Sequence, residues 1–376
     1  MNRKLIYIAV LCTFFACNEK YDFNVENEKE GIVVEASISD LSFMESLQFP
    51  SEGRYFKVRL TKTTKVDNVR DEKIIGAQVS LIDENGERYT YTEAKEEPGF
   101  YYLRDEFFEA RPNLGYKLEI SLATGQRFSS SWEHLPEVKS EMGDIHFDEI
   151  RKDIYKWEAG ERVIKNVRAI NVKTKVAGSG LEQKRFFRWT FEPIWVYVSA
   201  LAARDSPVRY CWVTSPFVLN EIVLNEDKGK GEYDQELFDL ETTGNELIYH
   251  YYSAIIHQES ISEGYYEFWL DFEEQKNKGG LYDKPPYGLP TNYIAENSDW
   301  TVNGYFAVVS ESAVRWEFTK DQLSYPVENN LKEICEEITD GSDQCVICTV
   351  YNIGTPKAQP PLWWTRETVE PFNVKY

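Results

Sequence analysis

Short segments in which polar and apolar residues alternate recur through residues 30–135, and turn sequences separate them. Because successive side chains of a strand point to opposite faces, this alternation predicts half-buried β-strands. The turns include Asn85-Gly86 and Pro98-Gly99, and Asn-Gly supplies the positive φ angles that a tight hairpin requires. Short strands with closely spaced turns are typical of a β-sandwich of the immunoglobulin-like or transthyretin-like kind. The seven predicted strands span residues 32–38, 55–61, 77–82, 88–92, 100–103, 116–122 and 126–132.

The composition favours the same fold class. Aromatic residues make up 15% of the chain, and segments with helical periodicity are few. Aromatic and β-branched side chains suit the half-buried surface of a pleated sheet, so we expect a mainly β protein. Aromatic side chains can also form platforms that bind sugars, but a role in the core is the favoured interpretation.

A second, larger domain is predicted for residues 136–376, after a boundary at Leu135-Pro136. We expect a β-rich α+β domain that ends in an extended, cysteine-bearing tail. One amphipathic helix is predicted near residues 262–276, because Ser262 can cap it and apolar side chains recur at helical spacing from Tyr265 to Phe272. The strands predicted in this domain span residues 144–148, 167–172, 185–191, 246–251 and 302–309.

The amino terminus has the features of a bacterial lipoprotein. A basic segment precedes an apolar run from Leu5 to Ala16, which is shorter than the roughly 20 residues that a membrane-spanning helix needs. Residues 1–16 are therefore predicted to be a signal peptide. Cys17 follows the small residue Ala16 and is predicted to carry the acyl lipid, such as palmitate. The alternative is an ordinary secretory peptide with a chance cysteine.

Residues 17–29 are predicted to form a lipidated acidic tether that stays unpacked. Glu19 and Asp22, close behind the lipidated cysteine, resemble the export signals that send lipoproteins to the cell surface. The expected location is therefore the outer membrane, with the protein held by its lipid and exposed at the surface. The alternative is an anchor that faces the periplasm, in which case the acidic tether is merely solvated.

The formal net charge of the chain is −21 at pH 7. A surface this acidic disfavours nucleic acid and anionic lipid as partners, because both are negatively charged themselves. We expect no nucleic-acid partner and a membrane contact made through the lipid anchor. The acidic residues are spread along the chain, which favours a role in solubility over cation binding.

Besides Cys17, the mature chain keeps four cysteines. Four cysteines in an exported protein suggest two disulfides, with three connectivities to choose from. The Cys345-x-x-Cys348 pair could also be a redox pair or half of a zinc site, but a zinc site needs four ligands. We predict that Cys211 bonds one tail cysteine and that the other two tail cysteines bond each other. The disulfide candidates are Cys211, Cys335, Cys345 and Cys348.

Sequence motifs for catalysis are missing. No serine lies in a G-x-S-x-G elbow, and no glycine-rich phosphate loop is present. The alternation of Asp144, His146 and Asp148 could hold a metal on one strand face, but a solvent-facing strand side has the same pattern. We therefore predict no catalytic residue, no metal ligand and no cofactor, while an acid–base site made of Asp and Glu stays open as an alternative.

An ordered set of short motifs runs along nearly the whole mature chain. After Cys17, the set consists of Ile32-Val33-Val34-Glu35, Gly76-Ala77-Gln78-Val79, Pro98-Gly99-Phe100-Tyr101, Gly115-Tyr116-Lys117-Leu118, Arg209-Tyr210-Cys211-Trp212, Tyr266-Glu267-Phe268-Trp269, Gly280-Leu281-Tyr282-Asp283, Gly304-Tyr305-Phe306, Cys345-x-x-Cys348 and Pro361-x-Trp363. In this order the motifs make the chain resemble domain-of-unknown-function family 4249, a family of Bacteroidota outer-membrane lipoproteins.

Members of that family look like companions of TonB-dependent outer-membrane transporters. The resemblance therefore implies a non-enzymatic lipoprotein that works as an accessory or ligand-capturing subunit of such a transporter. It implies no catalytic residue. Two alternatives remain open from the residues themselves. One is a secreted or surface hydrolase with an unrecognised carboxylate site, and the other is a surface adhesion or scaffold protein.

Overall fold

The computed structural model describes residues 30–63, 72–158, 160–178, 184–227, 229, 231–276, 288–327, 329, 331–337 and 343–364. The predicted signal peptide, Cys17 and the acidic tether lie outside these residues. Within them the protein is mainly β, as predicted. The strands form a fourteen-stranded sheet and a three-stranded sheet. None of the described helices combines the length and the apolar character that crossing a membrane requires.

All seven strands predicted in the first part of the chain are present. A short helix, α2 (Phe43–Ser46), lies in the connection between the first two strands. The Asn85-Gly86 turn joins the third and fourth strands, and Gly86 has the expected positive φ angle. The strands are β1 (Gly31–Ser39), β2 (Phe56–Lys62), β3 (Gln78–Asp83), β4 (Arg88–Glu93), β5 (Phe100–Leu103), β6 (Tyr116–Ser121) and β7 (Arg127–Ser130).

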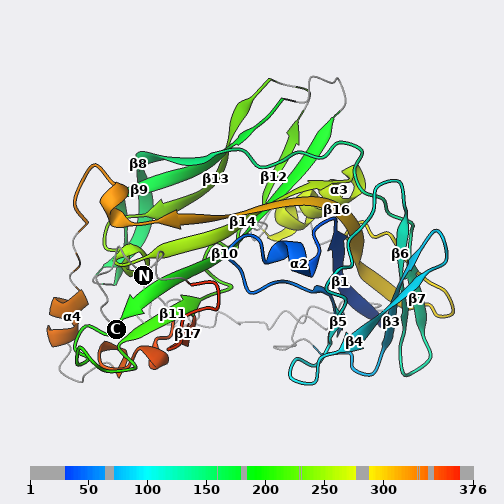
Figure 1. The fold of residues 1–376 in the computed structure, drawn as a ribbon, viewed down its shortest axis with the longest axis horizontal. Helices are drawn as coiled ribbons and strands as arrows, with labels where there is room; N and C mark the ends of the chain where they lie inside the picture. The colour runs from blue at the N-terminus through cyan, green and yellow to red at the C-terminus, as the bar shows by residue number, and fades with distance from the viewer. Residues whose placement is uncertain are drawn as a thin grey trace, which may run out of the picture.

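These strands fold over a single apolar core. Strands β1, β2 and β5 lie on one side of β4 in the strand order, and β3, β6 and β7 lie on the other. Leu60 on β2 and Leu118 on β6 are both fully buried in the same cluster. Residues from both sides of β4 therefore share one core, and the two halves of the strand path pack over it as two layers. Figure 1 shows this part at the right of the molecule.

The later part of the chain contains longer strands and the predicted helix. Helix α3 (Glu263–Lys276) begins after Ser262, whose side chain accepts a hydrogen bond from the Tyr265 backbone N–H. Tyr265 and Phe268 are the buried residues of its apolar face. The strands are β8 (Ile145–Glu158), β9 (Glu161–Val176), β10 (Arg185–Val198), β11 (Tyr210–Thr214), β12 (Val223–Asp227), β13 (Tyr233–Glu241), β14 (Tyr252–Ile261), β15 (Tyr293–Ala295), β16 (Thr301–Phe318) and β17 (Thr355–Lys357).

Strand β16 belongs to both parts of the molecule. Its first half, residues 301–309, pairs in parallel with β1, and its second half, residues 310–318, pairs with β14. β15 also pairs with β7 of the first part. A boundary at residues 135/136 therefore separates consecutive elements but does not separate the sheets. The large sheet runs without interruption from one part to the other, as Figure 1 shows.

A second core lies between the large sheet and the three-stranded sheet, which has the order β13-β9-β8. Alternate residues of β10, including Trp189 and Trp195, point into it and are fully buried. Val172 on β9 and Phe238 on β13 face them from the smaller sheet. The aromatic side chains therefore serve mainly as core residues, as the composition favoured.

Two predictions for this part of the chain were wrong. Residues 246–251 are not a strand, because Glu246–Ile248 forms a turn of 3-10 helix that Asn245 caps, and β14 begins only at Tyr252. The tail is not simply extended either. It contains α4 (Leu331–Glu337), two 3-10 turns at Asp343–Cys345 and Cys348–Val350, and β17. The disulfides hold these short elements in place, a constraint that alternation and periodicity do not reveal.

Candidate functional site

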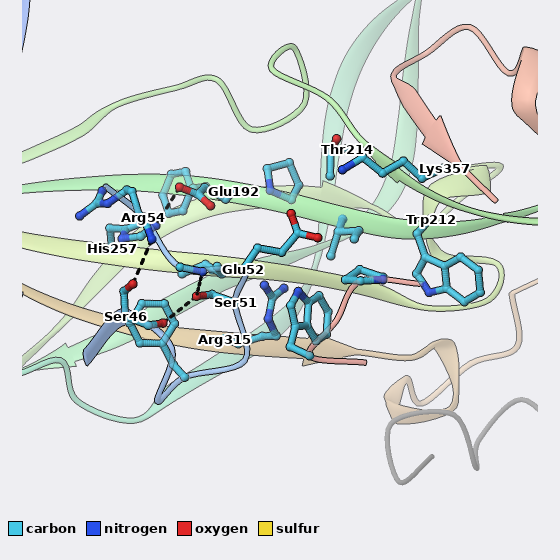
Figure 2. Close-up of a pocket in the computed structure, with 18 of the residues that line it drawn as sticks. Ser46, Ser51, Glu52, Arg54, Glu192, Trp212, Thr214, His257, Arg315 and Lys357 are labelled. Atoms are coloured by element: carbon cyan, nitrogen blue, oxygen red, sulfur yellow. Dashed lines mark hydrogen bonds and ion pairs between the residues drawn. The ribbon is translucent and has the colours of Figure 1, made fainter. Parts of the chain in front are cut away.

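A cavity of about 400 Å³ opens on the face of the large sheet opposite the second core. Its floor consists of side chains from β10, β14 and β16. The connection between β1 and β2 forms one wall, and the segment that contains β17 and residues 359–363 forms the other. Figure 2 shows the lining side chains. This volume lies within the range of small-molecule sites in proteins.

Strand register explains which side chains form the floor. Glu192 on β10 lies opposite Ile255 on β14, and Ile255 lies opposite Arg315 on β16. Opposed residues of neighbouring strands project from the same face of a sheet. One row of the sheet thus brings a carboxylate, an aliphatic side chain and a guanidinium to the cavity. The next row brings His257, which also lines it.

The carboxyl-terminal wall carries tryptophans. Strand β17 pairs with β11 and brings the following residues across the sheet face. The ring of Trp363 stacks on the guanidinium of Arg315, whose centre lies 3.8 Å from the ring centroid. Trp364 packs edge-on against Tyr251 and Trp212, with centroids 4.6 and 5.6 Å apart. This wall therefore presents a rigid aromatic surface beside a cation.

An ionic network around the buried side chains of His257 and Glu311 supports the opposite wall. The imidazole Nδ1 of His257 lies 2.8 Å from Glu311 Oε1, and its Nε2 lies 3.3 Å from the Glu192 carboxylate. Arg54, in the β1–β2 connection, forms an ion pair with the same Glu311. Asp40 directly follows β1 and accepts a hydrogen bond from the Glu311 backbone N–H at 2.7 Å. These contacts fix the β1–β2 connection against the sheet and so give the cavity its shape.

The charge state of His257 follows from this network. Burial disfavours a charged imidazolium, but the carboxylates of Glu192 and Glu311 outweigh burial and raise the pKa of His257 to about 9. Burial by itself would raise the pKa of Glu311. The positive charges of Arg54 and His257 outweigh burial and hold that pKa well below its usual range. His257 is therefore protonated at neutral pH. A protonated imidazole cannot accept a proton, so it does not act as a general base there.

The mouth of the cavity carries charges of both signs. In Figure 2, Glu52 reaches from the β1–β2 connection into the middle of the lining side chains, and Lys357 lies on the β17 side. Burial lowers the pKa of Arg315 to about 10, so its guanidinium remains charged at neutral pH. The cavity thus offers an exposed carboxylate, two cations and an aromatic face to a bound molecule.

The structure joins the four predicted disulfide cysteines as expected. Cys211 bonds Cys348, and Cys335 bonds Cys345. The prediction that Cys211 pairs with one tail cysteine and that the other two pair with each other is confirmed. Through Cys348 the tail is fastened to β11, the strand that β17 pairs with.

The residues of the alternative metal site contact different partners. The Nε2 atom of His146 lies 3.6 Å from an Asp234 carboxylate oxygen, and Asp148 forms an ion pair of 2.9 Å with Lys173. Throughout the described residues there is no group of three or more His, Cys, Asp or Glu side chains placed to hold a metal ion.

The cavity residues were not predicted from the sequence as a site. Arg54, Glu192, His257 and Arg315 are far apart in the chain and form no spaced motif. The one available signal was Pro361-x-Trp363 near the end of the chain, which was identified as a motif without a role. Pairing across three strands and the return of the tail bring these residues together.

Comparison with known proteins gives one match. A family model described as a domain of unknown function, DUF4249, matches residues 18–315. No curated protein and no solved structure matches the chain. The match covers well over half of the chain and includes the β1–β2 connection and the strands of the cavity floor, but stops before the tail. The chain therefore belongs to the DUF4249 family.

Proposed function

We propose that this protein is a non-enzymatic, lipid-anchored protein of the outer membrane that captures a small polar ligand for a TonB-dependent transporter. The observation that carries ligand capture is the cavity between the β1–β2 connection and the tail. Its aromatic wall and its charges of both signs are the features that orient small ligands in protein pockets. The proposed lipid anchor rests on the predicted signal peptide followed by Cys17, and the transporter partner rests on the family resemblance.

The contacts within the cavity support binding rather than catalysis. His257 is protonated between two carboxylates and is not available as a general base. The hydroxyls of Ser46 and Ser51 donate to the backbone carbonyls of Phe43 and Ser46. An activated serine would instead donate to a base within hydrogen-bond reach. These contacts count against the hydrolase alternative at this site.

The test of ligand capture is a thermal-shift screen of the purified protein against amino acids, short peptides, sugars and nucleosides. A compound that binds the folded state but not the unfolded chain raises the melting temperature, and the rise grows with the logarithm of its concentration above the dissociation constant. We expect at least one of these classes to stabilise the wild type. The Trp363→Ala variant should lose this stabilisation, because it removes the aromatic wall, whereas Trp132→Ala on the first part of the molecule should keep it.

Two results would count against ligand capture: no class stabilises the wild type, or Trp363→Ala responds as the wild type does. Transporter partnership needs its own measurement. Chemical cross-linking in intact cells, followed by purification under denaturing conditions, should recover a TonB-dependent transporter with the wild type. If the cross-linked partners include no such transporter, the partnership is wrong, whatever the cavity binds.

A further inference from the structure

The hairpin of β8 and β9 extends beyond its sheet. These strands pair along their whole length, from Ile145↔Thr174 to Glu158↔Glu161. β13 pairs with β9 only over residues 169–176. Residues 151–158 and 161–168 therefore form a two-stranded arm. Figure 1 shows β8 and β9 at the end of the molecule away from β3, β6 and β7. An isolated two-stranded ribbon is only marginally stable in water. The side chains that the arm exposes therefore indicate what it could contact.

Large apolar side chains gather on one face of the arm. Tyr155, Trp157 and Ile164 are 64%, 75% and 62% exposed. Tyr155 lies opposite Ile164, and Trp157 lies opposite Arg162, so all four side chains project from the same face. The guanidinium of Arg162 lies 4.2 Å from the Tyr155 ring centroid. Aromatic residues of this size are usually buried, and this group has no cover among the described residues.

The charge of the arm differs from that of the whole chain. It carries six basic and three acidic residues, whereas the chain has a net charge of −21. The lysines of the opposite face are neutralised, since Lys152 lies 3.2 Å from Asp239 and Lys156 lies 3.8 Å from Glu241. The aromatic face carries three arginines, Arg151, Arg162 and Arg168, and one carboxylate, that of Asp153, which accepts a hydrogen bond from Asn166 at 2.9 Å. None of these arginines has an ion-pair partner among the described residues. The aromatic face of the arm is thus also its positively charged face.

We propose that this face of the arm docks on an anionic phospholipid surface. Tyr and Trp favour the lipid–water interface because one end of each ring system is apolar and the other polar, and arginines beside them attract anionic headgroups. Tyr155 and Trp157 supply the interfacial aromatic side chains and Ile164 supplies an aliphatic one. Arg151 and Arg162 supply the headgroup contacts. The molecule as a whole is acidic, which disfavours anionic lipid, but this face of the arm is positively charged and can attract it.

The size of the patch favours a lipid surface over a protein partner. Three side chains of this size expose on the order of 400 Å². A specific protein interface buries roughly 800 Å² on each partner. Interfacial binding needs only a few inserted side chains and a favourable electrostatic contribution. Glu158 and Glu161 at the turn oppose deep insertion, although Lys165 pairs with Glu158 at 2.7 Å. The contact is therefore a shallow one, at the level of the headgroups.

The test uses the chain from Asn18 onward, which lacks Cys17 and contains every described residue, so that no acyl lipid contributes. Its binding is measured by co-flotation with vesicles of phosphatidylethanolamine and phosphatidylglycerol, and with vesicles of phosphatidylcholine. We expect the protein to float with the anionic vesicles and to dissociate as salt is raised. Replacing Tyr155, Trp157 and Ile164 by serine should lower the bound fraction about tenfold or more.

Matched controls separate the patch from general effects of substitution. Ile75, Phe107 and Ile294 are 62%, 75% and 63% exposed on the first part of the molecule, and their replacement by serine should leave flotation unchanged. Arg151→Gln with Arg162→Gln should weaken binding to anionic vesicles about tenfold. Lys152→Gln with Lys156→Gln removes the same charge from the opposite face and should have little effect.

Three results overturn the proposal. The first is that the wild type does not float with anionic vesicles at low salt. The second is that both serine variants float equally well. The third is that the wild type self-associates through the patch, as judged by sedimentation, without binding vesicles, which would assign the patch to a second copy of the chain. Ligand capture in the cavity does not depend on any of these outcomes.

Discussion

At the scale of single residues, His257 shows how a buried charge is tolerated. His257 is 3% exposed, yet it is held in its charged form because the carboxylates of Glu311 and Glu192 each contact one of its ring nitrogens. Burying such a group without partners would neutralise it. Glu311 in turn pairs with Arg54, so the histidine, the arginine and the two carboxylates stabilise one another, and the loss of one leaves the others unbalanced.

This arrangement predicts a pH dependence of stability. The pKa of His257 is about 9 in the folded protein and about 6.5 in an unfolded chain. A group whose folded pKa is raised stabilises the fold fully below its unfolded pKa. The stabilisation is then lost as pH rises through the folded pKa. We expect the free energy of unfolding to fall between pH 6.5 and pH 9, by about 3 kcal/mol at most.

Urea denaturation across this pH range measures the effect. The His257→Gln variant should be less stable than the wild type at pH 6 and should lose most of the pH dependence. His134→Gln, which alters an exposed histidine, should keep it. A variant at position 257 with the same slope as the wild type would assign the pH dependence to other groups.

Gly304 is a second residue with an identifiable physical role. It lies opposite Val34 where β16 pairs with β1, has a φ angle of +121°, and a Cβ there would overlap the Val34 carbonyl oxygen. Gly304→Ala should therefore destabilise the fold by about 3 kcal/mol through strain and overpacking. Gly231→Ala is the control, because its φ is ordinary and nothing lies within 4 Å of its Cβ position. Equal stability of the two variants would contradict this role.

At the scale of elements, the tail is held by covalent bonds as well as by β17. The Cys211–Cys348 disulfide closes a loop with a sequence separation of 137, whereas the Cys335–Cys345 disulfide closes one of 10. A disulfide restricts the unfolded chain more when its loop is longer. The two disulfides should therefore contribute unequally to the free energy of unfolding. The disulfide that closes the longer loop also links the cavity wall to β11.

We predict that Cys211→Ser with Cys348→Ser destabilises the protein more than Cys335→Ser with Cys345→Ser. Loop entropy gives roughly 5 kcal/mol for the first pair and roughly 3 kcal/mol for the second as upper values. Denaturant unfolding of the two double variants measures the ranking, and a reversed ranking would contradict it. Peptide mapping without reduction checks the pairing itself, and four free thiols in the exported protein would show that the bonds are not formed there.

At the scale of the whole molecule, we predict that attachment to the membrane depends on Cys17, which precedes β1. Cys17→Ser should release the protein from membranes and abolish lipid labelling, because the thiol that accepts the lipid is gone. A wild-type protein that carries the lipid should remain with the membranes in high salt. If the Cys17→Ser protein also remains there in high salt, the lipidation prediction is wrong. Docking of the arm does not confound this test, because salt screens its electrostatic contribution.

The side of the outer membrane is a separate prediction. If the acidic tether is the export signal, changing Glu19 and Asp22 to alanine should leave lipidation intact but keep the protein from reaching the surface. Proteinase treatment of whole cells distinguishes the two faces. If the wild-type protein resists digestion until the outer membrane is broken, the protein faces the periplasm. It would then have to contact the transporter from the periplasmic side.

The sequence by itself determined the local structure of the first part of the chain. All seven strands there follow from alternation and turn residues, and α3 follows from its apolar spacing and from Ser262 as its cap. These features are encoded within a few consecutive residues, so no distant contact is needed to predict them. Disulfide pairing of the cysteines was predicted on a different ground, because an even number of cysteines in an exported protein suggests that they pair.

Only the tertiary structure decided how these elements join. An 18-residue strand that pairs in parallel with β1 and then with β14 cannot be read from its own residues, because pairing partners lie up to about 270 positions away in the chain. The cavity depends on the same pairing. Glu192, His257 and Arg315 belong to three different strands, and nothing in the sequence links them. Strand register places them on one face of the sheet. Trp363 then completes the site, because the disulfide and β17 return the tail to that face.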